Sequence, residues 1–99
     1  FFMDRRRVVS MYVGEDVAWI DVHHKPICAA LGPDFFGNGR GAADQTTEEL
    51  EEILERICSG VLEREHGYLP PGLIEIEEHL DPKFNVMVYE AYYSEAKLA

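Results

Sequence analysis

The sequence predicts one α+β domain over residues 1–99, in which a four-stranded, mostly antiparallel sheet carries one long amphipathic helix across one face. Three observations lead to this fold class. One segment repeats its apolar residues at helical spacing, pairs of β-branched and aromatic segments flank it on both sides, and a short turn joins each pair. The predicted order is therefore ββαββ. With 99 residues and 46% hydrophobic content, the chain can bury a core without disulfides.

The helix is predicted from about Thr46 to His66. Thr46 can cap its first turn, and Glu49, three residues later, completes a capping box. Gly67 suits a left-handed C-cap, and the prolines that follow prevent continuation. The apolar residues of this segment form one stripe at helical spacing: Leu50, Ile53, Leu54, Ile57, Val61 and Leu62.

Four segments are predicted as strands: Arg7–Val13, Val17–His23, Leu73–Leu80 and Asn85–Tyr93. Turns join the first pair at Gly14-Glu15-Asp16 and the second pair at 81–84. Because such hairpins place their strands antiparallel, we expect an antiparallel sheet. Pro26–Leu31 has two interpretations. It is either one helical turn, begun by the proline and ended by Gly32, or an additional strand.

One helix covers only one face of such a sheet, yet most of the predicted strands are apolar on both sides. An uncovered aromatic face usually marks an interface. We therefore expect self-association, most simply as a homodimer, through five side chains: Tyr12, Trp19, Met87, Tyr89 and Tyr93. The alternative is that the segment 26–36 folds back and covers the second face.

The charge of the chain is segregated. Residues 44–81 hold 12 acidic residues against Arg56 and Arg64, whereas the remaining residues carry seven acidic and seven basic ones, so the net charge of −10 lies in one segment. A surface of this sign repels nucleic acid and anionic lipid and attracts cationic partners. We therefore expect a basic protein partner, with no direct binding to nucleic acid or membrane.

Location is predicted from the cysteines and the first residues. Cys28 and Cys58 lie in apolar contexts and are expected to be buried reduced thiols, which fits the cytoplasm. No apolar run approaches the ~18 residues of a membrane span, and the first residues do not follow the order of a secretory signal. One interpretation of Phe1 and Phe2 is that they were added before a native start at Met3.

The leading functional hypothesis is a non-enzymatic binding or regulatory module. Its predicted contacts with a basic partner are the helix residues Glu48, Glu51, Glu52 and Glu55, together with Arg40 from a glycine-rich loop. Acidic residues four positions apart in a helix repel each other and lower its stability. A helix that nevertheless carries them indicates that a high density of negative charge has a function there. A specific form of this hypothesis is an inhibitor that imitates nucleic acid. The alternative is that the glutamates only confer solubility.

The opposing hypothesis is a small oligomeric enzyme. Asp21 and His23 share a face of one predicted strand, and Glu77 and His79 share a face of another. If these faces coincide and the strands adjoin, the four side chains could bind a divalent metal, or Asp21, His23 and His79 could perform acid–base catalysis. The leading hypothesis involves no metal or cofactor.

The loop Gly37–Gly41 resembles an anion-binding loop in composition only. A phosphate site requires its glycines at the helix N-terminus, whereas residues 42–45 intervene here, and Glu48 and Glu49 would repel a phosphate. We therefore expect a mobile surface loop and no nucleotide site.

Overall fold

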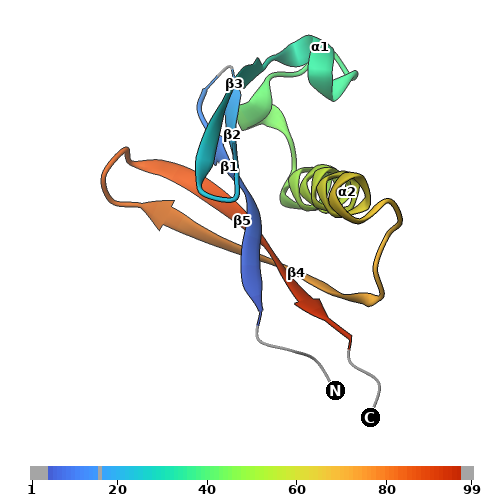
Figure 1. Ribbon diagram of the computed structural model, residues 1–99. Helices are drawn as coiled ribbons and strands as arrows, with labels where there is room; N and C mark the ends of the chain where they lie inside the picture. The colour runs from blue at the N-terminus through green and yellow to red at the C-terminus, as the bar shows by residue number, and fades with distance from the viewer. Residues whose placement is uncertain (1–4, 16, 97–99) are drawn as a thin grey trace.

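The computed structural model describes residues 5–15 and 17–96. Its elements are β1 (Arg6–Val13), β2 (Ala18–Val22), β3 (Lys25–Leu31), α1 (Pro33–Phe36), a short 3₁₀ helix η1 (Ala42–Asp44), α2 (Thr47–His66), β4 (Gly72–Asp81) and β5 (Val86–Glu95). The strands form one antiparallel sheet in the order β3-β2-β1-β5-β4, and α2 crosses one face of it (Figure 1). The α+β class with one long helix is thus confirmed. The interpretation of Phe1 and Phe2 lies outside the described residues.

The sheet has five strands where four were predicted, so the order is βββαββ. The ambiguous segment is strand β3, which pairs with β2 at the edge of the sheet. An edge strand tolerates Pro26 because only one side of the strand needs its N–H groups for the ladder. The helical turn comes later, in α1, where Pro33 occupies the first turn and Gly37 ends the helix at φ 74°. Because β3 lies within the sheet, it does not fold back over the second face.

Helix α2 begins and ends as predicted. Thr46 Oγ1 accepts the N–H of Glu49 at 3.1 Å, and Glu49 Oε1 accepts the N–H of Thr46 at 3.2 Å, which completes the capping box. At the other end Gly67 adopts φ 79° and donates its N–H to the Glu63 carbonyl at 2.8 Å. The side chains that α2 buries are Leu50, Leu54, Cys58 and Leu62.

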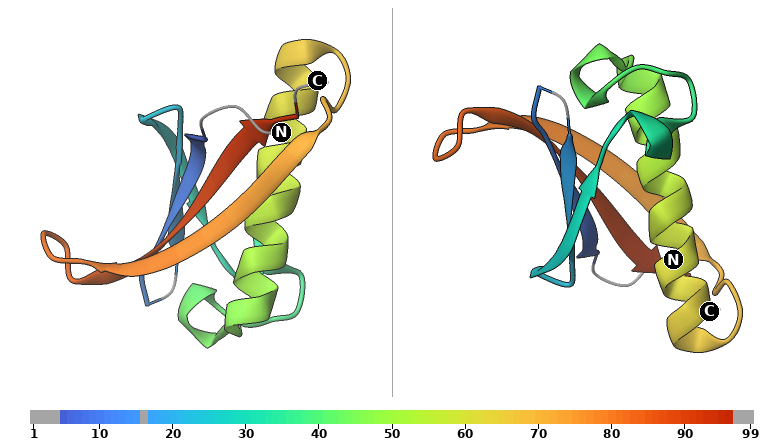
Figure 2. Two further views of the ribbon diagram at one scale, coloured as in Figure 1. Left: turned by 90° about the horizontal axis from the view of Figure 1, so that it is seen from below. Right: turned by 90° about the horizontal axis from the view of Figure 1, so that it is seen from above.

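The core lies between these side chains and the facing side of the sheet. The strand register places Met11 of β1 between Ile20 of β2 and Tyr89 of β5, and all three are buried. The neighbouring row contains Val9 and Ala91, which have no exposed surface. Figure 2 shows the sheet twisting so that the turn of the β4–β5 hairpin projects past β1, β2 and β3, away from α2. None of the helices in residues 5–15 and 17–96 is both long and apolar enough to cross a membrane.

Cys58 is fully buried on α2, and this burial raises the pKa of its thiol from 9.0 to about 11. The unfolded chain therefore loses this proton first as the pH rises. The stability that Cys58 contributes should be complete below pH 9 and should be lost as the pH rises towards 11.

We expect Cys58→Ala to flatten the decline of unfolding free energy over this pH range, as measured by denaturant melts of both proteins. The tyrosines titrate in both proteins, so the difference between the two pH dependences of the unfolding free energy isolates the contribution of Cys58. Equal slopes would contradict the prediction.

Candidate functional site

The acidic surface is formed by Glu48, Glu51, Glu52 and Glu55 of α2 with Glu78 of β4. All are exposed except Glu51, which is half-buried. The two elements meet near Tyr89, where burial is the main cause that raises the pKa of the phenol, and where the carboxylates of Glu78 and Glu51 raise it further. Glu51 of α2 and Glu78 of β4 therefore both lie near Tyr89, which connects the acids of the two elements.

This surface retains most of its negative charge. Glu52 has a weak, exposed ion pair with Arg56 of the next helical turn, at 3.6 Å. For the other four glutamates, no Lys, Arg or His nitrogen of the described residues lies within 4.0 Å of the carboxylate. A cationic partner could approach these groups without displacing an internal ion pair.

Arg40, the predicted contact residue, makes contacts within the chain. Its guanidinium pairs with Glu49 at 2.7 Å and donates to the Asp44 carbonyl at 3.0 Å. Gln45, which is buried, donates to Asn38 Oδ1 and to the carbonyls of Arg40 and Gly41 at 3.1–3.2 Å. The segment that was expected to be a mobile loop is thus hydrogen-bonded against the start of α2, and Arg40 holds it there.

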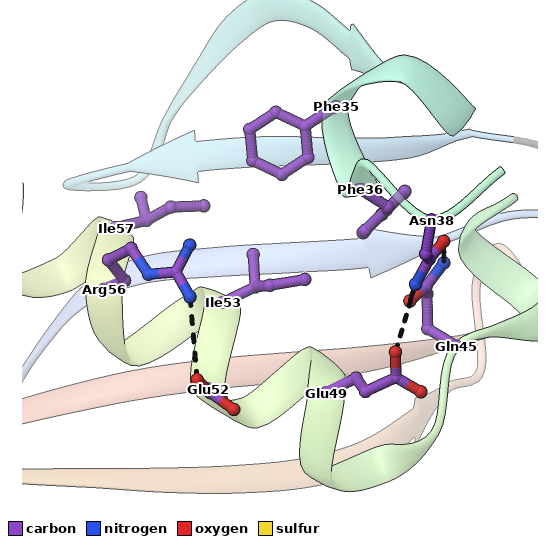
Figure 3. Close-up of a pocket in the computed structure, with 9 residues that line it drawn as sticks. All are labelled: Phe35, Phe36, Asn38, Gln45, Glu49, Glu52, Ile53, Arg56 and Ile57. Atoms are coloured by element: carbon purple, nitrogen blue, oxygen red, sulfur yellow. Dashed lines mark hydrogen bonds and ion pairs between the residues drawn. The ribbon is translucent and has the colours of Figure 1, made fainter. Parts of the chain in front are cut away.

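A groove between α1 and α2 adjoins the acidic surface (Figure 3). Its volume is about 390 Å³, and its lining residues are Phe35, Phe36, Asn38, Gln45, Glu49, Glu52, Ile53, Arg56 and Ile57. Two phenylalanine rings from α1, 5.4 Å apart and edge to face, oppose two isoleucines from α2. Glu52 belongs both to this rim and to the acidic surface. We call this the α1–α2 groove. The sequence features that could have indicated it are the Phe35-Phe36 pair and the two isoleucines, Ile53 and Ile57, at the side of the apolar stripe of α2.

The histidine–carboxylate site does not assemble. Strands β2 and β4 do not adjoin, because β1 and β5 lie between them. His23 instead pairs with Glu65 of α2 at 2.6 Å, and His79 contacts Glu90 at 3.3 Å. Across residues 5–15 and 17–96, no three His, Cys, Asp or Glu side chains gather as metal ligands. The pair Asp21 and His23 is therefore separated by two strands from the pair Glu77 and His79, so neither the residues proposed for a metal nor those proposed for catalysis come together.

Glu90, which was not among the predicted site residues, lies on the open face, the side of the sheet away from α2. It is only 5% exposed, and its carboxylate pairs with Arg7 and accepts hydrogen bonds from Ser10 at 3.5 Å and Tyr92 at 3.4 Å. Burial lowers the pKa of the Arg7 guanidinium, but the hydrogen bond and charge of Glu90 outweigh burial and raise it. The signal in the sequence is a lone acidic residue within an apolar strand.

The five residues proposed as an oligomer interface do not share one surface. Tyr89 and Tyr93 are 5% and 4% exposed in the core beneath α2, and Met87 alternates onto the same side of β5. Tyr12 and Trp19 pair with each other on the open face. Of the five residues, only Tyr12 and Trp19 remain candidates for a contact between copies.

In comparisons with known proteins, no family model, curated protein or solved structure matches this chain.

Proposed function

We propose that this protein is a non-enzymatic binding module that engages a basic segment of a partner protein. The observation that carries the proposal is the position of the acidic surface beside the α1–α2 groove, with Glu52 shared by both. Charge alone would favour any cation, whereas an adjoining apolar groove selects a segment that also presents apolar side chains. An inhibitor that occupies the basic groove of a nucleic-acid-handling protein is one specific form of the proposal.

The two parts have different roles in binding. The unneutralised glutamates accelerate encounter with a cationic partner, and this attraction is screened over about 10 Å at 0.1 M salt. The groove supplies apolar contact, with Phe35 and Ile53 on opposite walls. A basic amphipathic helix meets both demands, since its apolar side chains fit a groove and its cations project to the rim.

Replacing Glu51, Glu52 and Glu55 by glutamine should weaken partner binding and flatten its salt dependence. Folding should be unchanged or slightly improved, because Glu48/Glu52 and Glu51/Glu55 are like-charged pairs four residues apart, each costing a few tenths of a kcal/mol, about 0.2–0.5. A partner identified by pull-down from the native host would be titrated with purified wild-type and variant proteins across a salt series, with melting temperature recorded for each.

A matched control replaces Glu15, Glu63 and Glu95, which are exposed and lie outside the acidic surface, by glutamine. This control removes the same formal charge. It should lower affinity much less than the first variant. If both variants bind alike, or if the first keeps wild-type affinity and salt slope, the glutamates confer solubility only and the proposal fails.

A further inference from the structure

A second groove lies on the open face, between the tip of the β4–β5 hairpin and strands β2 and β3. It has a volume of about 610 Å³, and we call it the aromatic groove; its lining residues are Tyr12, Trp19, Asp21, Pro26, Phe84 and Val86. The hairpin tip projects on the side of the sheet away from α2 (Figure 1). This groove is therefore separate from the acidic surface of α2 and from the α1–α2 groove.

We propose that the aromatic groove binds a small organic cation, an ammonium group attached to an apolar body. Three aromatic side chains line it, and the faces of such rings attract cations within about 6 Å. Asp21 is the one charged residue in the lining and supplies the counter-charge. The volume lies within the roughly 300–1,000 Å³ that is usual for small-molecule sites.

The charges around the groove agree with this ligand class. No Lys, Arg or His nitrogen of the described residues comes within 4.0 Å of the Asp21 carboxylate. Burial raises the pKa of Tyr12, and the negative charges of Asp21 and Asp81 raise it further against the opposing charge of Arg7. Arg7 is itself paired with Glu90. An anionic ligand would meet uncompensated carboxylate charge here.

Trp19 is packed in place before any ligand binds. A Cβ placed on Gly14 would lie 2.8 Å from Trp19 Cζ3, so the indole packs directly against the glycine backbone. Trp19 and Phe84 nevertheless remain 47% and 62% exposed. At the tip, Lys83 Nζ lies 5.2 Å from the centre of the Phe84 ring, so the ammonium group of Lys83 makes a cation–π contact with that ring. Lys83 is then a competitor of the ligand.

A second copy of the chain suits this groove less well than a cation does. A two-fold contact through the groove would bring the Asp21 carboxylates of the two copies towards one another, which is unfavourable. The groove is complementary to positive charge, since Asp21 is the one charged residue in its lining.

Trp19 is the single tryptophan of the chain, so its fluorescence reports directly on the groove. Wild-type protein would be titrated with benzyltrimethylammonium, with benzyl alcohol as the neutral probe and phenylmethanesulfonate as the anionic probe. We expect saturable binding of the cation, binding of the alcohol at least about tenfold weaker, and no binding of the anion. Equal binding of cation and alcohol would overturn the proposal, and this comparison requires no variant.

Two substitutions localise the site. Asp21→Asn should weaken the cation about tenfold, whereas Asp34→Asn, an equal charge change at an exposed position on α1, should not. Lys83→Ala should tighten binding, because it removes the competing ammonium. Circular dichroism melts verify that each variant is folded. Wild-type affinity in Asp21→Asn would overturn the proposal, as would failure of the cation to bind the wild-type protein. If light scattering then shows a dimer, a second copy covers the groove instead.

Discussion

Leu54→Ala is expected to lower the free energy of unfolding by about 2–5 kcal/mol. Leu54 has no exposed surface and lies at the middle of the buried stripe of α2, between Leu50 and Cys58. The substitution removes the transfer free energy of the lost atoms and leaves a cavity that the twisted sheet beneath cannot fill completely. Denaturant melts measure the change directly.

Ile57→Ala is the matched control for this prediction. Ile57 lies on the same helix but is half-buried and lines the α1–α2 groove. Its loss should cost less stability than that of Leu54, because part of the side chain already contacts water. Under the proposed function, it should also weaken partner binding. A loss below about 1 kcal/mol for Leu54→Ala would mean that α2 does not cover the sheet as described.

The features that sequence predicted well are local ones. The capping box at Thr46 and Glu49, the C-cap at Gly67 and the apolar stripe of α2 depend on residues at most a few turns apart. The sequence leaves the segment of strand β3 ambiguous, because its choice between helix and strand depends on its place in the sheet. Pro26 argues against a central strand. Only the order of the strands in the sheet, which places β3 at the edge, makes a strand acceptable there.

The candidate sites depended on which strands are neighbours in the sheet, and the spacing of residues along the sequence does not show this. Asp21 and His79 could share a site only if β2 adjoined β4, but β1 and β5 separate them. Alternation predicted correctly that Tyr89 and Val88 lie on opposite sides of β5, but it could not determine which side α2 would cover. For the same reason Glu90 was not expected beside Arg7, which is 83 positions away in the chain.

Glu90→Ala is the second substitution with a large expected effect. Removing one partner of a buried ion pair leaves the other charge uncompensated, which typically costs about 3–5 kcal/mol. The Arg7 side chain is 24% exposed and can recover some hydration, so we expect a loss of about 2–3 kcal/mol. Denaturant melts of the variant against wild type test this expectation.

The double substitution Arg7→Leu with Glu90→Leu separates a structural role from a functional one. If the pair serves the fold alone, an apolar replacement of both partners should restore most of the stability lost in Glu90→Ala, because neither charge is then left buried. If Glu90→Ala instead leaves stability within about 0.5 kcal/mol of wild type, the pair is not structural. The half-exposed imidazole of His79, 3.3 Å from Glu90, would then make acid–base chemistry on the open face the better explanation for a buried carboxylate there.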